Sequence, residues 1–343
     1  LNGNEIALAR RERKIVSGHN GFLIETDKSI TIEEDLMRRD ITINSIAMDV
    51  LTDEIVDPFH GMEDIKNQII RATSKAFSED PLRVYRVARF ASQLGFGVEY
   101  ATLKRMRFLK NELDSLSAER VFVEFRKALL SEHPAAFFQV LRKCDCLGIH
   151  FKEIWKMIGI AQPIQYHPEG DVYEHTMEVL ERCAIETNHE LIRFAALVHD
   201  FGKIATPNEM LPHHYQHEKR GDELIRNFCH RLKMPNHYQK VGLTASNEHM
   251  KAGLFDTLKV SKKVDFIEKN AKTILGLKGL EVLANCDKVR ENRIEFCTVG
   301  EQMLQEVNGN TIPLEGLSAI QINERLRQAR IKWLTNHLSL PTK

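Results

Sequence analysis

Two residues near the start of a helical stretch have side chains suited to recognising a base, Asp80 and Arg83. A carboxylate only accepts hydrogen bonds and a guanidinium only donates them, so together they complement an exocyclic amine beside an unprotonated ring nitrogen. Cytosine and adenine present that order, whereas guanine and uracil present the reverse. The pair is therefore predicted to accept CTP and ATP. Arg86 and Arg89 follow at one-turn intervals, and their forked guanidinium groups suit phosphate oxygens.

A second group of candidate residues combines imidazole and carboxylate side chains. His175 lies in one helical segment, and the adjacent His199 and Asp200 follow an apolar stretch, with Lys203 three positions later. These groups suit a divalent transition metal or magnesium, and a His-Asp doublet at a helix end can direct both side chains to one ion. Lys203 is positioned to steady a phosphate. Further histidines could line the same pocket: His217 is favoured for this, and structural roles are favoured for His213, His214 and His249.

The first candidate group needs a helix to position it. Asp80 is a typical N-cap residue and Pro81 suits the first helical position, so the sequence predicts a helix that begins here. An apolar face follows at helical spacing and the three arginines lie on the opposite side. The predicted anion-binding face has an alternative interpretation, in which the arginines only pair with surface carboxylates.

Length and composition limit the class of protein. The chain has 343 residues, enough for two or three domains, and its 48 basic residues balance 48 acidic ones. Zero net charge argues against a non-specific polyelectrolyte binder and leaves room for local basic patches. Six cysteines without a CxxC pair favour a reducing cytoplasm. The sequence shows no signal peptide and no apolar run of the roughly 18 residues that a membrane span needs.

The chain is predicted to be mostly α-helical. Residues 1 to about 60 mix short β-type runs with turns and suggest part of an α/β unit, with a short helix after the turn at residues 57–61. From Asp80 onward helical periodicity extends almost to the end. Breaks in this periodicity suggest a neck at about 76–145, a larger helical domain at about 165–300 and an amphipathic tail.

Three segments, in order and spacing, closely resemble the class II tRNA nucleotidyltransferases, the CCA-adding enzymes. They are RRDITINSIA at residues 38–47, DPFHG at 57–61 and EDPLRVYRVARF at 79–90. The resemblance extends over nearly the whole chain and is greatest to the bacterial type with a C-terminal HD domain. It implies the end of an α/β nucleotidyltransferase head at 1–75, a nucleotide-recognising and tRNA-binding neck at 76–145, an HD domain at 165–300 and a helical tail at 301–343.

The same resemblance assigns roles to residues of the head and neck. It implies that Asp80 and Arg83 template the incoming base, in agreement with their donors and acceptors. The other implied nucleotide contacts are Arg39, Arg86 and Arg89, with Asp40 and Asn44 helping to select the ribose. For Arg39 a surface ion pair with Glu33 or Glu34 is the alternative, and for Asn44 it is simple capping.

Two motifs of that family do not occur in this sequence. These are the glycine-rich triphosphate-binding turn and the Asp-x-Asp pair that holds two Mg²⁺ ions for nucleotidyl transfer. Glu5 aligns with a third acidic position, but one carboxylate cannot hold the metals. Since the chain begins at Leu1, we expect that the N-terminal part of the head is missing and that the chain alone lacks transferase chemistry.

The His-Asp pattern resembles the HD superfamily of metal-dependent phosphohydrolases, whose last ligand is usually an aspartate on a distant helix. Asp287 is the best candidate for that ligand, and the implied metal set is His175, His199, Asp200 and Asp287, with Ni²⁺ and Mg²⁺ as candidate ions. Within the CCA family, this domain implies phosphatase, 2′-nucleotidase and 2′,3′-cyclic phosphodiesterase activities.

The expected partners are tRNA, ATP and CTP, without a membrane, for a monomer or homodimer. Basic side chains that position RNA through its phosphates are expected at Lys104, Arg105, Arg107, Lys110, Arg120, Arg126, Lys127, Arg325, Arg327 and Arg330. Each could instead be part of a solvated helix face. Two alternatives to the CCA-adding enzyme remain: a stand-alone HD phosphohydrolase and a non-catalytic tRNA-binding remnant.

Overall fold

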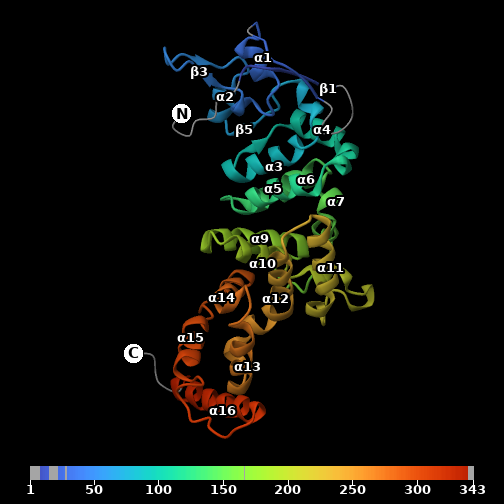
Figure 1. The fold of residues 1–343 in the computed structure, drawn as a ribbon. Coiled ribbons are helices and arrows are strands. Elements are labelled where there is room, and N and C mark those ends of the chain that lie inside the picture. Colours follow the sequence, from blue (N-terminus) through green and yellow to red (C-terminus); the bar gives the residue numbers. More distant parts are fainter. Residues whose placement is uncertain (1–7, 15–21, 28, 166, 339–343) are drawn as a thin grey trace. The chain divides into compact units, whose positions relative to one another are not determined.

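The structure is a computed structural model that describes residues 8–14, 22–27, 29–165 and 167–338 (Figure 1). It divides into two compact units. The first comprises Leu1–Ile158 and His230–Met234, and the second comprises Gly159–Cys229 and Pro235–Lys343. Helices dominate both units and the strands are short, as the sequence predicts.

The β-structure described here consists of three two-stranded pairs in the first unit. β1 (Arg11–Lys14) pairs antiparallel with β2 (Phe22–Glu25), and β3 (Ala47–Met48) pairs antiparallel with β4 (Ile55–Val56). β5 (Ile69–Ile70) pairs in parallel with β6 (Gly97–Val98). The parallel pair departs from the expectation that strands end before Asp80, because Gly95 ends the preceding helix in the left-handed region (φ 68°) and releases the chain into β6.

Helices and 3-10 turns make up most of the first unit. Its helices are α1 (Ile32–Met37), α2 (Gly61–Lys66), α3 (Arg83–Leu94), α4 (Tyr100–Phe108), α5 (Ala118–Leu129), α6 (Pro134–Lys143), α7 (Leu147–His150) and α8 (Lys152–Lys156). Its 3-10 turns are η1 (Thr42–Asn44), η2 (Lys75–Glu79) and η3 (Lys110–Ser115). A capping box starts α1: Thr31 accepts from the Glu34 amide and the Glu34 side chain accepts from the Thr31 amide.

The helix that carries the three arginines begins later than predicted. α3 starts at Arg83 rather than at Asp80, whose carboxylate accepts a hydrogen bond from the Leu82 amide at 3.0 Å and closes a turn before the helix. α3 packs against α5 and α6 (Figure 1). Tyr85 joins a buried aromatic cluster there, and its hydroxyl lies 2.6 Å from Nδ1 of His150. Burial of such side chains contributes roughly 1.5–3 kcal/mol each to folding.

Helices and 3-10 turns make up most of the described residues of the second unit, which also has an isolated antiparallel bridge between Ala161 and Asp171. It contains α9 (Val172–Glu186), α10 (Glu190–Val198), η4 (Phe201–Ala205), η5 (Asn208–Met210), α11 (His217–Arg231), α12 (Asn236–Gly253), η6 (Phe255–Thr257), α13 (Val260–Asn270), α14 (Gly276–Asp287), α15 (Cys297–Glu306) and α16 (Ala319–Leu338). α9, α10, α12 and α14 pack together around an apolar core, and α16 packs on α13 and α15.

Two local features fix the geometry of this helical core. Arg193, fully buried on α10, donates to the carbonyl of Ala184 at 3.0 Å and to that of Thr187 at 2.7 Å, which holds the end of α9 against α10. Gly202 brings η4 against α11, since a Cβ at this position would lie 1.8 Å from the carbonyl oxygen of His217. Across the described residues, each helix is too short or too polar to cross a membrane.

Candidate functional site

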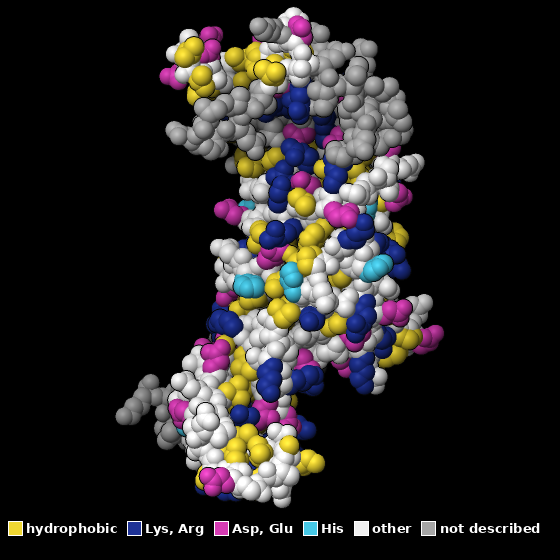
Figure 2. Space-filling model, in the orientation of Figure 1, with side chains coloured by type: hydrophobic (Ala, Val, Ile, Leu, Met, Phe, Trp, Pro, Cys, Tyr) yellow, Lys and Arg dark blue, Asp and Glu magenta, His cyan; other side chains and the backbone are white. Residues whose placement is uncertain are grey.

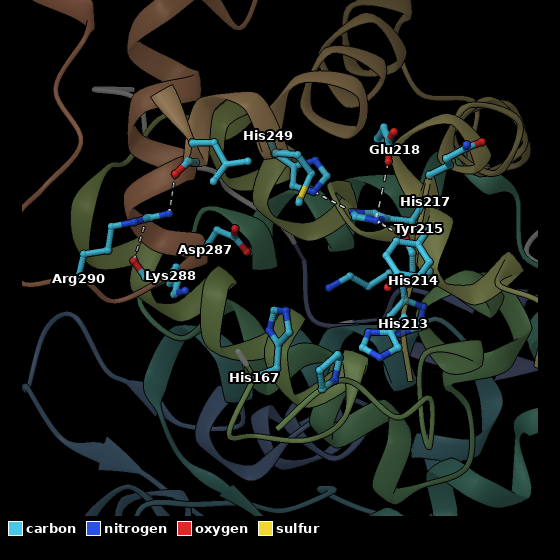
Figure 3. Close-up of a pocket in the computed structure, with 16 residues that line it drawn as sticks. His167, His213, His214, Tyr215, His217, Glu218, His249, Asp287, Lys288 and Arg290 are labelled. Carbon is cyan, nitrogen blue, oxygen red and sulfur yellow. Dashed lines mark hydrogen bonds and ion pairs between the residues drawn. The ribbon is translucent and has the colours of Figure 1, made fainter. Parts of the chain in front are cut away.

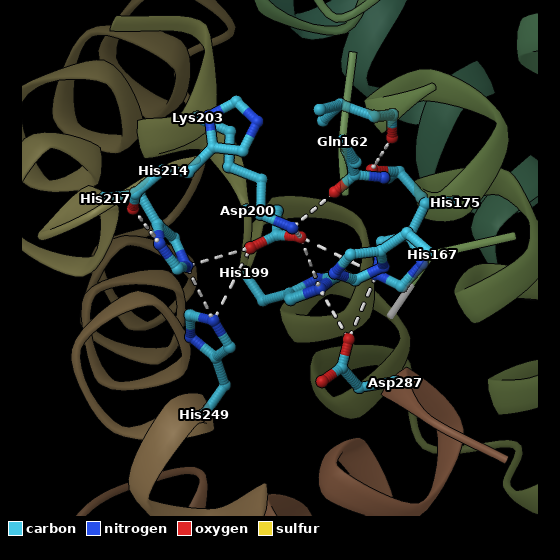
Figure 4. Close-up of polar contacts among 12 residues, drawn as sticks. Gln162, His167, His175, His199, Asp200, Lys203, His214, His217, His249 and Asp287 are labelled. Atoms are coloured by element: carbon cyan, nitrogen blue, oxygen red, sulfur yellow. Dashed lines mark hydrogen bonds and ion pairs between the residues drawn. The ribbon is translucent and has the colours of Figure 1, made fainter. Parts of the chain in front are cut away.

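The four predicted metal ligands come together in the second unit (Figure 4). His175 lies in the first turn of α9, His199 and Asp200 follow α10, and Asp287 ends α14. One potential ligand atom from each of the four lies within 4.8 Å of the others. The Asp287 Oδ1 atom is 3.0 Å from His175 Nε2 and 3.3 Å from His199 Nε2. Residues 112 positions apart in the sequence thus converge on one point.

Hydrogen bonds orient the two imidazoles toward that point. His199 Nδ1 lies 2.8 Å from the Ala196 carbonyl, so this nitrogen carries the donated proton and Nε2 faces the carboxylates. His175 Nδ1 is 2.5 Å from a carboxylate oxygen of Glu169, which lies just before α9. Glu169 was not predicted from the sequence. What could have suggested it is a carboxylate six residues before a candidate histidine ligand. It supports a candidate ligand as a carboxylate partner commonly does in metal sites.

Asp200 is shared between this group and a second cluster. The second cluster consists of Asp200, His217 at the start of α11 and His249 on α12. Asp200 Oδ2 faces His199 and His175, whereas Oδ1 lies 3.2 Å from His217 Nε2 and 3.5 Å from His249 Nε2. Figure 4 shows the carboxylate between these two pairs of rings.

The second cluster repeats the tautomer pattern of the first. His217 Nδ1 lies 2.8 Å from the His214 carbonyl, and His249 Nδ1 lies 3.0 Å from the Ala245 carbonyl. Their Nε2 atoms therefore face each other at 3.1 Å. The sequence favoured His217 as a contributor, as placed here, but favoured a structural role for His249, which the fold brings to the same carboxylate. His214 is structural: its ring is buried and bonded to Thr206 and to the Ala161 carbonyl.

The burial of unsatisfied polar atoms shows that these residues suit a cation. His199 and Asp200 are 0% and 1% exposed. Neither Asp200 oxygen nor His199 Nε2 has a hydrogen bond of acceptable geometry. Lys203 and the neighbouring imidazoles form ion pairs with Asp200, but polar atoms left without a hydrogen bond in the interior are costly, and a cation would satisfy all three together. Imidazole nitrogens with carboxylate oxygens are a donor set that divalent metals accept, so the residues fit the implied group.

The pKa shifts of His199 and Asp200 also indicate a site that favours positive charge. Burial opposes the charge on the imidazole, but the carboxylates of Asp200 and Asp287 outweigh it and raise the pKa of His199 to about 10. Burial would raise the pKa of Asp200, yet His199 and Lys203 hold it well below its usual value. The arrangement of anions therefore stabilises positive charge at its centre.

Lys203 lies deeper than a freely accessible phosphate-binding side chain would. It is 5% exposed, and its Nζ is 2.6 Å from Asp200 Oδ2 and donates to Gln162 Oε1 at 2.5 Å. The structure thus places Lys203 against a candidate metal ligand and on the lining of a pocket. The pocket has a volume of about 470 Å³, and Asp287, His217 and His249 are among the residues that line it (Figure 3).

The residues predicted to recognise the base do not pair with each other in the first unit. Arg83 is 9% exposed, and its guanidinium donates to the carbonyl oxygens of Ala76 and Arg38. Asp80 Oδ2 instead lies 3.4 Å from a guanidinium nitrogen of Arg120. The base-recognising role of Asp80 and Arg83 stays a prediction, and it requires Arg83 to exchange these carbonyl partners for a base.

Four other predicted nucleotide contacts form one network. Arg86 Nε lies 2.6 Å from Asp40 Oδ2, Asn44 donates to Asp40 Oδ1 at 3.0 Å, and Arg39 donates to the Asn44 carbonyl at 3.0 Å. Burial would raise the pKa of Asp40, but Arg86 and Asn44 lower it. Arg39 pairs at 3.6 Å with Asp35 rather than with Glu33 or Glu34. Arg39 thus forms an ion pair, but not with Glu33 or Glu34 as the alternative had it, and its contact with a nucleotide stays a prediction.

Arg89 lies outside that network. It is 7% exposed, its Nε is 2.5 Å from a Glu124 carboxylate oxygen, and its guanidinium lies 3.8 Å from the centre of the Phe90 ring. The expectation of one exposed arginine face on α3 was therefore wrong for Arg83 and Arg89, because the interior supplies acceptors for both. Glu5, the possible third carboxylate, lies outside the described residues.

Several of the basic side chains expected to contact RNA already have partners. Lys110 lies 2.8 Å from Asp145, and Arg105 donates to the Ser74 carbonyl at 2.6 Å. On α16, Arg327 and Arg330 pair with acidic residues of α13 at 2.7 Å. Figure 2 shows basic and acidic side chains interspersed on the visible face. Some of these basic side chains therefore make contacts within the protein.

Comparison with family models divides the chain into three matching regions. Residues 3–71 match the Poly A polymerase head domain, residues 95–158 match the probable RNA and SrmB-binding site of polymerase A, and residues 172–266 match the HD domain. The last match contains His175, His199, Asp200, His217 and His249, but ends before Asp287.

Several curated relatives share the name multifunctional CCA protein. The chain is 46% identical to that of Shewanella frigidimarina over 71% of this chain and 60% of the relative. It is 38% identical to that of Shewanella denitrificans over 96% of this chain and 83% of the relative. For Pseudoalteromonas atlantica the identity is 39%, over 98% of this chain and 86% of the relative.

Solved structures agree on the fold. An apo CCA-adding enzyme superposes with a TM-score of 0.60 at 19% identity, covering 96% of this chain and 72% of the other. The Bacillus stearothermophilus CCA-adding enzyme in complex with CTP gives a TM-score of 0.56 at 21% identity, covering 92% and 72%. At these identities the likeness supports the fold alone.

Proposed function

Because the chain belongs to the family of multifunctional CCA proteins, we propose that its second unit is a divalent-metal-dependent phosphohydrolase. The observation that carries this proposal is the buried Asp200 carboxylate, whose two oxygens face two imidazoles each and accept no hydrogen bond of good geometry. We infer that one ion is held by His175, His199, Asp200 and Asp287, and a second by Asp200, His217 and His249.

The residues around the ligands have separate tasks in this proposal. A bound divalent ion supplies Lewis-acid polarisation of a phosphoryl oxygen and lowers the pKa of water. Glu169 and the Ala196 carbonyl keep His175 and His199 in the tautomers that present Nε2. Lys203 holds Asp200 in place, bridging it to Gln162, and carries positive charge at the floor where a phosphate dianion would arrive.

The proposed substrates are phosphate esters of nucleotides. Following the family resemblance, they are 2′,3′-cyclic phosphodiesters, nucleoside 2′-phosphates and simple phosphomonoesters. Ni²⁺ and Mg²⁺ are the ions to compare first, because imidazole ligands favour the former and carboxylates accommodate the latter.

The test begins with the full chain stripped of metal by a chelator. Ni²⁺, Mg²⁺, Mn²⁺ or Zn²⁺ is then added while hydrolysis of adenosine 2′,3′-cyclic phosphate, adenosine 2′-phosphate and p-nitrophenyl phosphate is followed. We expect turnover to return with at least one ion, at a stoichiometry above one per chain. Hydrolysis that survives chelation unchanged would overturn the proposal.

A matched pair of substitutions on α12 separates the two clusters. His249→Gln removes one ligand of the second cluster, and His237→Gln changes an exposed histidine of the same helix. We expect the first variant to bind about one ion fewer and the second to behave as the unmodified chain. Equal metal content in both variants would leave only the four-ligand site.

We also propose that the first unit takes part in CCA addition to tRNA, using CTP and ATP. The network of Arg39, Asp40, Asn44 and Arg86 supports this, because it gathers residues of the RRDITINSIA and EDPLRVYRVARF segments around one buried carboxylate. Mg²⁺ would be required for the transfer step itself. The expected outcome is tighter binding of CTP and ATP than of GTP and UTP, measured by calorimetry with the chain.

A transfer assay complements the binding measurement. The chain is incubated with Mg²⁺, CTP, ATP and a tRNA that lacks its 3′ end, and CMP and AMP incorporation is measured. Binding without incorporation would support nucleotide recognition alone, and hydrolysis without nucleotide selectivity in the first unit would favour the stand-alone HD phosphohydrolase. Binding of tRNA without either activity would favour the tRNA-binding remnant.

The setting and assembly of the protein remain proposals as well. All six cysteines are buried and free, which supports a reducing compartment and hence the bacterial cytoplasm. We propose a monomer or a homodimer, which sedimentation at several concentrations distinguishes. A larger stable oligomer would contradict this.

A further inference from the structure

A short loop beside the metal ligands displays two aromatic rings. His213 and Tyr215 lie between η5 and α11, and their rings are close to parallel, with an interplanar angle of 17° and centroids 5.6 Å apart. Both side chains are exposed, Tyr215 to 65%. The Tyr215 hydroxyl has no hydrogen-bond partner among the described residues. Neither burial nor a hydrogen bond of the tyrosine hydroxyl therefore explains why the two rings are stacked.

Buried residues anchor the chain on both sides of Tyr215. His214 is 8% exposed and uses both ring nitrogens, one toward Thr206 and one toward the Ala161 carbonyl. His217 is 5% exposed and contacts Asp200. The backbone is thus fixed on either side of Tyr215, which turns His213 and Tyr215 outward on a rigid support. A preorganised aromatic surface loses little conformational entropy when a ligand covers it.

The outward rings lie on the wall of the pocket above the metal ligands. His213 and Tyr215 line the cavity of about 470 Å³ together with His217, His249, Asp287 and Lys203 (Figure 3). Its volume falls within the usual range for small-molecule sites. Met250 and Leu254 add apolar surface to the same cavity and are 45% and 52% exposed. An aromatic and apolar wall thus adjoins a floor built for metal ions and phosphate.

These observations specify a ligand with two different ends. A phosphate suits the cationic floor, whereas a flat ring suits the exposed aromatic pair, because bases stack on aromatic side chains through their π-faces. We propose that Tyr215, backed by His213, is a stacking platform for the base of a nucleoside phosphate whose phosphate lies at the metal ligands. This inference rests on the proposed phosphohydrolase function and names a residue that selects nucleotides over other phosphate esters.

Two sources share this chemistry, a free nucleotide and the terminal nucleotide of an RNA. In both, one ribose separates the base from its 2′- or 3′-phosphate. Stacking makes no demand on the identity of the base, so the platform favours nucleotides as a class. The selection is therefore against phosphate esters that have no ring.

The test compares Tyr215→Ala with Tyr215→Phe, which retains the ring. Phe108→Ala on α4 serves as the control, since Phe108 is also a solvent-exposed aromatic residue, 80% exposed against 65% for Tyr215, and lies in the other unit. KM and kcat are measured for adenosine 2′-phosphate, for adenosine 2′,3′-cyclic phosphate and for β-glycerol phosphate, which has no ring.

We expect Tyr215→Ala to raise KM for both nucleotides by about 10-fold or more, with Tyr215→Phe and Phe108→Ala close to the unmodified chain. KM for β-glycerol phosphate should change less than about 2-fold, because that substrate has no base to stack. An equal change for all three substrates, or none for the nucleotides, would overturn the inference.

A binding measurement keeps this inference distinct from the proposed hydrolysis. Fluorescence anisotropy of 1,N⁶-ethenoadenosine 2′-phosphate is titrated with the metal-loaded chain and its variants. Binding that weakens in Tyr215→Ala but not in Tyr215→Phe supports the platform even where no turnover occurs, and then only the proposed phosphohydrolase fails. If the chain hydrolyses the nucleotides but Tyr215→Ala does not weaken nucleotide binding, the phosphohydrolase proposal stands and the stacking platform fails.

A second substrate, an RNA, distinguishes a free nucleotide from the terminal nucleotide of an RNA as the ligand. A short oligoribonucleotide ending in a 2′,3′-cyclic phosphate is compared with the mononucleotide. If Tyr215→Ala impairs both, the platform accepts any nucleoside phosphate, and if it impairs only the oligonucleotide, the platform serves an RNA end. Either result supports stacking, whereas indifference of both substrates contradicts it.

Discussion

The candidate metal site of the second unit and the arginines of α3 in the first unit differ in how their charged groups are satisfied. At the candidate metal site, Asp200 and His199 are buried with polar atoms that make no good hydrogen bond. On α3, each of Arg83, Arg86 and Arg89 already contacts a carboxylate or a carbonyl. The first arrangement is completed by adding a cation, whereas the second must exchange existing partners to bind a nucleotide.

The largest effect is expected from removing the carboxylate shared by both metal clusters. Asp200→Asn keeps the shape of the side chain but loses its charge, so both clusters should lose metal affinity. Turnover of adenosine 2′-phosphate should fall by at least about 100-fold. Mass spectrometry measures the metal content and steady-state kinetics measure kcat, with His237→Gln as the control. Full activity in Asp200→Asn would remove Asp200 from the site.

Arg89 tests whether a buried arginine of α3 has a structural role. Arg89→Met leaves the Glu124 carboxylate in the interior without its partner, and we expect the free energy of unfolding of the first unit to drop by about 3–5 kcal/mol. Urea unfolding measures the loss. The double variant Arg89→Met with Glu124→Leu should recover most of it, because an apolar pair replaces a buried charge. A loss that the double variant leaves uncorrected would point to packing rather than charge.

Arg86 should behave in the opposite way. Its side chain is 35% exposed, so Arg86→Met is expected to lower the unfolding free energy by only about 1 kcal/mol. Affinity for CTP and ATP should fall by about 10-fold, the loss of one charge-assisted phosphate contact. Calorimetry with both nucleotides checks this. If Arg86→Met destabilises the unit as much as Arg89→Met does, the contrast between the two arginines is broken.

The smallest expected effect concerns pH. The carboxylates raise the pKa of His199 to about 10, above its unfolded value near 6.5. Its stabilising contribution to the metal-free chain is therefore complete below about pH 6.5 and is lost as the pH rises through about 10. We expect Tm of the chelator-treated chain to fall over this window, and the metal-loaded chain to fall less. An identical pH dependence with and without metal would contradict the assignment.

The same contrast explains which predictions the sequence could support. The candidate ligands His175, His199 and Asp200 were identifiable because adjacent imidazole and carboxylate groups at a helix end are uncommon and chemically distinctive. His249 was not, since an isolated histidine within an amphipathic helix has no local signal, and only the packing of α12 on α10 brings it to Asp200. Its role depends on contacts across 49 residues of sequence.

The helical character of the chain was also predictable, whereas the exposed arginine face of α3 was not. Periodicity identifies the apolar side of a helix, but it does not show whether neighbouring segments supply buried acceptors to the polar side. Glu124 on α5 and the carbonyls of Ala76 and Arg38 do so here. The beginning of α3 shifted by three residues because the Asp80 side chain closes a turn rather than capping the helix directly.

The contact between Lys203 and Asp200 bears on metal loading. The ammonium group lies 2.6 Å from the carboxylate, and the raised pKa of His199 adds a proton nearby. In the folded chain these cations already face the carboxylates of the candidate site. A metal ion that bound there would displace protons, so we expect its rate of loading to increase with pH.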